Sequence, residues 1–519
     1  MRSKRLTWRV VGAVAVCALA AVAVTSSALA RSSASSVLID GTTDTVTNVD
    51  PAGNYDFGSF TVDELIFQHL LELAPGGKVV PGLAKSCSAS ANLKTWTCSL
   101  KTGIHFQNGD AFSSADVKWS FDRVIKIKDP SGISSLLSNL KSTSVAGPNR
   151  VVFHLTNPQS TWPFILTTGA GFIVPKGAYP ADKLNPNTSA QYGTGPYQLV
   201  KYTSGQQAVF KAYNGSSVKA KTPNLIINYY SKSSTMKLAI QKGEIDMAFR
   251  DFTPTEYGSL GKASGIKVYT GNGVVIRYLV LNVKQKPFDN PAVRKAIAYL
   301  IPRQTIATRV YHGLVKPLWS MVPAGLPGHT DIFKTVYGSA PSKAKAAAVL
   351  KKAGVTTPVA VTLWWTPTHY GDASADEYAE IQRALNASGL FKVTLQSAEW
   401  ATYSKTLGTQ YGAFQLGWFP DYPDAEDYLL PFYGTKSNFT SNGYSSSAMD
   451  AILKREQGAR TNAGRIATIK AAQVLSAKDA PIIPYWQGAM VAVGRKGVSG
   501  IQRTLDPTFI LRFWLISKS

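Results

Sequence analysis

The chain has 519 residues, of which 45% are hydrophobic and 17% are charged, with a formal net charge of +24 and a mean hydropathy of −0.04. This balance excludes a disordered chain and a protein with many membrane spans, and the length predicts two or three lobes with cores of their own. The positive charge is spread without a dense basic run, and no nucleic-acid-binding signature is present, so the charge favours solubility and attraction to an anionic cell envelope over nucleic-acid binding.

The N-terminus has the pattern of a secretory signal peptide. Basic residues between Arg2 and Arg9 precede an apolar stretch, Val10–Val24, and Ala28-Leu29-Ala30 offers a small-x-small cleavage site. We therefore expect export of the protein and cleavage after Ala30, the alternative being an uncleaved anchor. Cys17 lies inside the apolar stretch and not at its end, so the pattern that directs lipid attachment is poor.

Two cysteines, Cys87 and Cys98, remain after the signal peptide is removed. An even count in an exported protein favours one disulfide, and two buried thiols are the alternative. Residues Thr95–Leu100 alternate so that Trp96, Cys98 and Leu100 share one face, which predicts a strand. If Cys87 lies on the partner strand, the disulfide joins the two strands of a hairpin.

The first elements along the chain are a strand from Val37 to about Asn48 and a helix over Val62–Leu73, where apolar residues recur at helical spacing. His69 in this helix is expected to be a packed or surface histidine, because no second metal-type residue lies four positions away. Ser113 followed by Asp116 has the spacing of a capping box and predicts a helix start.

Later in the chain, residues 235–242 predict a helix that ends at Gly243, followed by a strand over Asp246–Phe249, and such alternation suits α/β lobes. The apolar run Ala413–Leu416 predicts a buried strand. Gly417 and two prolines then stop it, which places the acidic and aromatic segment Gly417–Asp427 at the strand's end, a usual place for a ligand site.

The chemistry of this segment allows several interpretations. A carboxylate beside Trp418 and Tyr422 suits a cationic group such as a free amine, and the alternative is a solvated acidic turn. Paired carboxylates could also serve a glycosidase, or bind calcium, but the EF-hand pattern and the common hydrolase motifs are absent. The six histidines are scattered and give no case for a transition-metal site. We expect Asp424 and Asp427 to be solvated.

Six short motifs occur in one order across nearly all of the expected mature chain. They are Phe106–Arg123 (FQNGDAFSSADVKWSFDR), Gly193–Tyr197 (GTGPY), Gly243–Asp246 (GEID), Arg277–Ile297 (with RYLVLN and PFDNPAVRKAI), Lys343–Gly354 (KAKAAAVLKKAG) and Gly417–Asp427 (GWFPDYPDAED). In these motifs the chain resembles extracellular solute-binding proteins of family 5, the oligopeptide- and dipeptide-binding subunits of ABC importers. It departs from the family in having Pro302-Arg303 where Asp-Arg is frequent, and in lacking the usual lipid-attachment motif.

The resemblance implies an α/β fold of the periplasmic-binding-protein-like type II, cluster C-like kind, with two main lobes, an extra subdomain and interleaved chain crossings at the hinge. The implied lobe I comprises residues 31–50, 190–273 and 487–519, its extra subdomain 51–189, and lobe II 274–486. The implied function is to capture a small ligand, above all a peptide, between the lobes and to deliver it to an ABC transporter permease. We expect a monomer that is not an enzyme and uses no cofactor or metal.

The resemblance also implies roles for particular residues. In peptide-binding members the aspartate that matches Asp421 anchors the α-amino group of the ligand. Trp418, Tyr422 and Trp400 are expected pocket walls, with core packing as the alternative for the tryptophans, and Trp486, which follows the second expected hinge crossing, is a further wall. No arginine can be assigned by motif to a ligand carboxylate. An oligosaccharide or a metal chelate stays open as the ligand, and a secreted carboxylate-dependent hydrolase is a third alternative.

Overall fold

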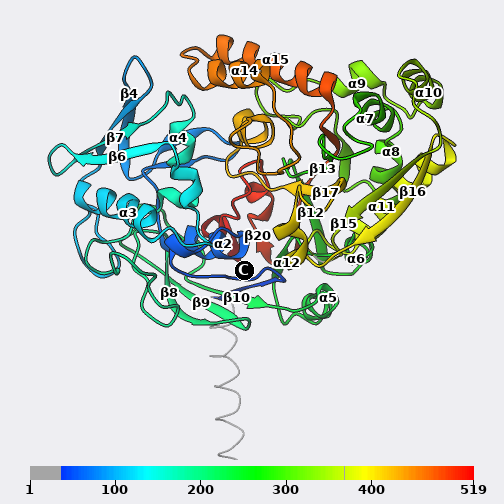
Figure 1. The fold of residues 1–519 in the computed structure, drawn as a ribbon. Coiled ribbons are helices and arrows are strands. Elements are labelled where there is room, and N and C mark those ends of the chain that lie inside the picture. The colour runs from blue at the N-terminus through cyan, green and yellow to red at the C-terminus, as the bar shows by residue number, and fades with distance from the viewer. Residues whose placement is uncertain (1–36, 368) are drawn as a thin grey trace, which may run out of the picture.

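The computed structural model describes residues 37–367 and 369–519 and contains three main β-sheets (Figure 1). The expected signal peptide, its cleavage site after Ala30 and Cys17 lie outside the described residues. Among the described residues, no helix combines the length and the apolar character that crossing a bilayer requires.

The first sheet has seven strands and takes them from both ends of the chain. Their order is β12 (Ile266–Gly271), β19 (Met490–Arg495), β11 (Met247–Phe249), β1 (Val37–Thr42), β10 (Asn224–Tyr229), β9 (Gln207–Ala212) and β8 (Tyr197–Thr203). Strand β1 pairs in parallel with β10 and β11, and β19 lies antiparallel between β11 and β12. Helix α5 (Ser233–Lys242) connects β10 to β11, and helix α6 (Pro254–Leu260) connects β11 to β12.

The second sheet has six strands and lies on the right in Figure 1. Their order is β14 (Val315–Pro317), β18 (Ile482–Gly488), β13 (Ile276–Leu281), β17 (Ala413–Trp418), β15 (Val359–Trp365) and β16 (Phe391–Ser397). The parallel neighbours β15 and β16 are joined through α11 (Ala373–Ala387), as parallel pairing requires a crossover. The longer of the other helices in this part of the chain are α7 (Pro291–Ala298), α9 (Ile332–Tyr337), α10 (Lys343–Lys352), α14 (Ser447–Gln457) and α15 (Asn462–Asp479), and the short ones are α8 (Arg303–Thr305), α12 (Trp400–Tyr403) and α13 (Leu430–Tyr433).

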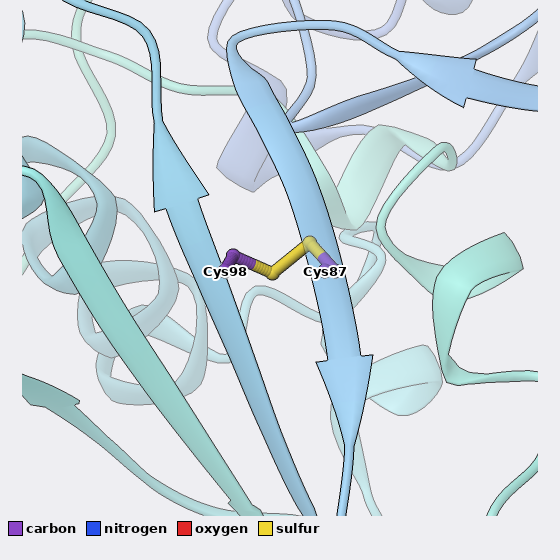
Figure 2. Close-up of a disulfide and its surroundings, with 2 residues drawn as sticks. All are labelled: Cys87 and Cys98. Carbon is purple, nitrogen blue, oxygen red and sulfur yellow. A yellow bond between two sulfur atoms is a disulfide. The ribbon is translucent and has the colours of Figure 1, made fainter.

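The third sheet has four antiparallel strands and lies at the upper left in Figure 1. Their order is β4 (Ala84–Ala89), β5 (Thr95–Leu100), β7 (Arg150–Leu155) and β6 (Leu140–Val145), with α3 (Ser114–Ile127) beside β6 and β7. Figure 2 shows Cys87 of β4 joined to Cys98 of β5, which lie directly opposite each other in the ladder. The predicted disulfide and hairpin are confirmed.

The chain passes between the first two sheets at two places. It leaves the first sheet after β12 and enters the second at β13, and it returns directly from β18 to β19. Trp486 lies in β18, so it precedes the return crossing, and the expectation that it follows this crossing is wrong. The ends of β13, β17 and β18 that carry Arg277, Gly417 and Trp486 therefore adjoin the crossings.

Most of the elements expected from the sequence are present. The capping box at Ser113 starts α3, Gly243 ends α5 in the left-handed conformation at φ 84°, and β17 contains the predicted buried strand. The expected helix over Val62–Leu73 is wrong in extent, because α2 spans Phe57–Ile66 and Leu71–Leu73 forms strand β2, paired with β3 (Val79–Pro81). Similarly, the first strand ends at Thr42 and does not extend to Asn48.

Candidate ligand-binding site

The acidic segment follows directly from β17, whose last residues Gly417 and Trp418 pair with Arg277 and Ile276 of β13. Proline cannot donate to a strand ladder, so Pro420 ends the pairing and the chain turns away from the sheet. This turn places Asp421 between the second sheet and the α2 part of the chain.

Asp421 is half-buried and makes a contact across 366 residues of sequence. The hydroxyl group of Tyr55, just before α2, lies 2.7 Å from Oδ1 and 2.8 Å from Oδ2 of Asp421 and donates to this carboxylate. Burial raises the pKa of Asp421 to about 6, although hydrogen bonds that its carboxylate accepts from Tyr55 and from Asp427 oppose the rise. A carboxylate in such surroundings gains from a cationic partner that also satisfies its free lone pairs.

Asp427 holds the turn that presents Asp421. Its side chain is only 1% exposed, and Oδ2 accepts hydrogen bonds from the indole Nε1 of Trp418 at 2.8 Å and from the backbone N of Asp421 at 3.1 Å. Burial and the charge of Asp421 raise the pKa of Asp427 well above its usual range. Trp418, an expected pocket wall, is half-buried with its N–H group committed to this bond and its ring edge-on to Phe432.

The expectation that Asp424 and Asp427 are solvated is wrong. Asp424 is 3% exposed, pairs with both terminal nitrogens of Arg465 from α15, and accepts the backbone N–H of Glu426 at 2.9 Å. Glu426 is also buried and bonds to Thr161. These carboxylates connect the segment to its neighbours in the fold, so within 421–427 Asp421 is the acid left half-exposed.

A pocket opens beside Asp421, with about 630 Å³ of empty space when the open solvent at its mouth is included. Its lining includes residues of helix α2, residues 508–511, Pro420 and Asp421. The apolar lining includes four phenylalanine rings, Phe57, Phe60, Phe172 and Phe509, and Glu64 is the second carboxylate. Largely apolar walls that include aromatic rings, with a few placed polar groups, are typical of a small-molecule site.

None of the four expected wall residues, Trp418, Tyr422, Trp400 and Trp486, lines this pocket. Tyr422 is 6% exposed and stacks on Phe164 with ring centres 5.6 Å apart, while Trp486 is 4% exposed. Trp400 is half-buried and stacks on His369 at 3.6 Å. Tyr422 thus packs into the core of the third sheet, and ligand contact by these four residues stays a prediction.

His69 is buried, and its surroundings agree with a packed histidine. Its ring stacks on Phe172, and Nδ1 lies 3.2 Å from Glu72. Glu64, His69 and Glu72 bring potential metal-ligand atoms within 4.8 Å of one another. Burial lowers the pKa of His69, but the charges of Glu72 and Glu64 outweigh this effect and raise it overall, so a protonated imidazole can balance the two carboxylates.

Sequence analysis did not find Tyr55 or Glu64. Tyr55 stands in no motif, and its bond to Asp421 joins segments that lie far apart in sequence. Glu64 was placed on a helix, but an isolated helical glutamate is a solvated residue by default. Tyr55 and Glu64 are recognised as site residues only because α2 lies close to Asp421 in three dimensions, and no pattern in the sequence indicates this.

One protein-family model matches most of the chain and shows its family. The model of "Bacterial extracellular solute-binding proteins, family 5 Middle" matches residues 78–440. The chain belongs to this family. The resemblance stated from the six motifs is therefore confirmed, and the family is one of transporter-associated binding proteins.

Individual relatives agree with this assignment. The chain is 26% identical to the glutathione-binding protein GsiB of Salmonella choleraesuis over 474 residues, covering 89% of this chain and 91% of the relative. It is 25% identical to the dipeptide-binding protein of Escherichia coli K12 over 480 residues, covering 85% and 87%. Among solved structures, the periplasmic binding protein DppA of Helicobacter pylori, in complex with the peptide STSA, matches with a TM-score of 0.79 at 23% identity, covering 93% and 98%. The predicted two-lobed, type II α/β fold is confirmed.

Proposed function

We propose that this family 5 protein is the extracytoplasmic receptor for short peptides of an ABC importer, and that Asp421 binds the peptide's α-amino group. The observation that supports this most directly is a half-buried carboxylate at the edge of an aromatic pocket, held in place by the buried Asp427. An ammonium group is a small cation with three donors, which the two oxygens of Asp421 can accept alongside Tyr55. The names of GsiB and of the dipeptide-binding protein, which describe short peptide ligands, support the same ligand class.

The proposed mechanism is closure of two lobes on the ligand. Lobe I comprises residues 31–50, 190–273 and 487–519 with its extra subdomain 51–189, and lobe II comprises 274–486. The two direct connections, β12 to β13 and β18 to β19, act as the hinge. A peptide that contacts both lobes stabilises the closed form by its differential affinity for that form, and the permease then recognises the closed form. The protein acts as a monomer and leaves the ligand chemically unchanged.

The proposed processing is cleavage of the signal peptide after Ala30, without lipid attachment, which gives a mature chain that begins at Arg31. Export fits the disulfide between Cys87 and Cys98, because such bonds persist in oxidising compartments.

A peptide-binding screen tests the proposal. Purified protein should be stabilised against thermal unfolding by a mixture of tri- and tetrapeptides with free termini, by about 2.7 kcal/mol when a ligand is present at 100 times its Kd. Mass spectrometry of the ligand released by mild denaturation should identify intact peptide. Stabilisation by oligosaccharides or metal chelates and not by peptides would contradict the proposed ligand class, and recovery of hydrolysed ligand would show a hydrolase.

A further inference from the structure

One buried arginine in the described part of the chain differs from the others in having no hydrogen-bond partner. The five buried arginines are Arg123, Arg277, Arg294, Arg303 and Arg512. Two of these pair with aspartates and two donate to backbone carbonyl oxygens. Arg277 is 4% exposed, yet its Nε and Nη1 are buried without an acceptor, and it forms no ion pair with any described residue.

A buried guanidinium without an acceptor is costly, because it has lost its water and gained no counter-charge. The carboxylate of Glu377 does not fill this role. It accepts four hydrogen bonds, from Tyr311, Gln415, Tyr485 and Trp486. Since a carboxylate offers about four lone-pair sites, Glu377 has none left for Arg277. No described protein atom supplies the missing acceptor.

The guanidinium group of Arg277 is nonetheless held in place. Its Cζ lies 3.9 Å from the ring centre of Tyr370 and 4.8 Å from that of Trp486. It also occupies the space where residue 417 would have a side chain, because a Cβ built on Gly417 would lie 1.6 Å from Nη1. Aromatic faces orient an arginine while leaving its N–H groups free for a planar anion.

The electrostatic field here favours an anion. Burial and then the charges of Arg277 and Arg250 lower the pKa of His369 to about 3, so two guanidinium groups act on one ring. Arg250 is balanced by Asp44 and Asp251 at 3.3 and 2.8 Å. Arg277 has no such partner, and its charge stays available to a ligand.

We propose that Arg277 is the anion subsite of the ligand site and binds a carboxylate of the ligand, so that the protein selects short zwitterionic peptides. This inference rests on the proposed function, in which Asp421 binds the amine. Gly417, against which Arg277 lies, is four residues from Asp421, so their Cα atoms are at most about 14 Å apart. That span equals about four extended residues, which sets the scale of the ligand. The carboxylate is either the peptide's C-terminus or an acidic side chain.

Three peptides distinguish a C-terminal carboxylate from a side-chain carboxylate. They are trialanine, trialanine amide, and Ala-Glu-Ala amide, whose only carboxylate is in its side chain. With the parent protein, calorimetry should show trialanine amide binding at least about 30-fold more weakly than trialanine. In Arg277→Gln, trialanine and its amide should bind equally weakly. If Ala-Glu-Ala amide binds the parent as tightly as trialanine and loses this affinity in Arg277→Gln, the subsite also takes side-chain carboxylates.

Arg294→Gln is the matched control, since Arg294 is a buried arginine whose three guanidinium nitrogens all donate to carbonyl oxygens. It should lower the melting temperature and leave the ratio of acid to amide affinity unchanged. Unliganded Arg277→Gln should melt no lower than the parent, because it removes an unpaired buried charge. A melting temperature that falls in Arg277→Gln, with the acid-to-amide ratio retained, would show a purely structural arginine.

Binding of the three peptides to the parent protein tests the proposal even if the variants do not fold. Equal binding of trialanine, trialanine amide and Ala-Glu-Ala amide would overturn the role of Arg277 and leave the peptide receptor intact. Binding of none of the peptides by a folded parent would overturn both the proposed function and this subsite.

Discussion

Acidification should weaken peptide binding with a midpoint near pH 6, because the amine requires the ionised form of Asp421. Burial raises the pKa of this carboxyl to about 6 in the unliganded protein, whereas a peptide's α-amino group, with a pKa near 8, stays protonated throughout. One proton then competes with the ligand, so the affinity should fall by about tenfold between pH 7 and pH 5. Below pH 5 the affinity should continue to fall by about tenfold per pH unit.

The Tyr55→Phe variant tests whether the pH midpoint of peptide binding reflects the ionisation of Asp421. The Tyr55 hydroxyl donates to the ionised carboxylate and thereby lowers the pKa of Asp421. Its removal should raise that pKa and move the binding midpoint above pH 6. A hydrogen bond to a charged group is worth about 1.5 kcal/mol, or about one pH unit, and solvent screening at a tyrosine that is 40% exposed makes this an upper limit.

The assay is titration calorimetry with trialanine from pH 5 to pH 8, in buffers of different ionisation enthalpy. Proton release on binding should be largest below pH 6 and should shift with Tyr55→Phe. Tyr213→Phe is a suitable control, because Tyr213 bonds to the carbonyl oxygens of His105 and Phe106, not to Asp421. Affinity that does not change between pH 5 and pH 7, or a midpoint that Tyr55→Phe leaves in place, would show that Asp421 does not control the pH dependence of binding.

The same carboxyl affects unliganded stability with the opposite sign. The pKa of Asp421 is about 6 in the folded protein and near 4 in the unfolded chain. Its favourable contribution to the free energy of unfolding is therefore complete below about pH 4 and is lost as the pH rises through about 6. A loss of peptide affinity on acidification therefore cannot arise from Asp421 destabilising the fold.

Two further predictions concern stability. Asp424→Asn should lower the free energy of unfolding by about 2 kcal/mol, measured by urea denaturation, because it removes one of the two buried counter-ions of Arg465 and leaves only Glu456; a change below about 1 kcal/mol would contradict the buried pair. Thiol alkylation of the native protein without reductant should label neither Cys87 nor Cys98, and reducing their disulfide should cost about 2 to 3 kcal/mol, while labelling of both would contradict the bond.

Local patterns predicted much of the fold. The alternation in Thr95–Leu100 predicted β5, the Ser113 capping box predicted α3, and Gly243 predicted the end of α5. These signals depend on neighbours within a few residues, which the sequence shows directly. The overall architecture came from the order of six family motifs and not from any one of them.

Long-range contacts account for what the sequence did not predict. The helical spacing over Val62–Leu73 continues past Ile66, but pairing with β3 makes Leu71–Leu73 a strand. Asp424 was expected to be solvated because its partner, Arg465, stands 41 residues later. Arg277 belongs to a family motif, yet only the burial of its nitrogens without an acceptor distinguishes it from a structural arginine.

The affinity of Asp421→Asn for trialanine decides whether Asp421 binds the amine of the peptide. Removing the charge should weaken binding by about 2 to 5 kcal/mol, at least about 30-fold, because the amine would be enclosed without its counter-ion. The melting temperature of the unliganded variant should stay close to that of the parent, since Asp421 is half-buried and its ionised form is already disfavoured. Asp122→Asn, on the exposed face of α3, controls for the change in net charge. Trialanine binding as tight in a folded Asp421→Asn protein as in the parent would contradict the account.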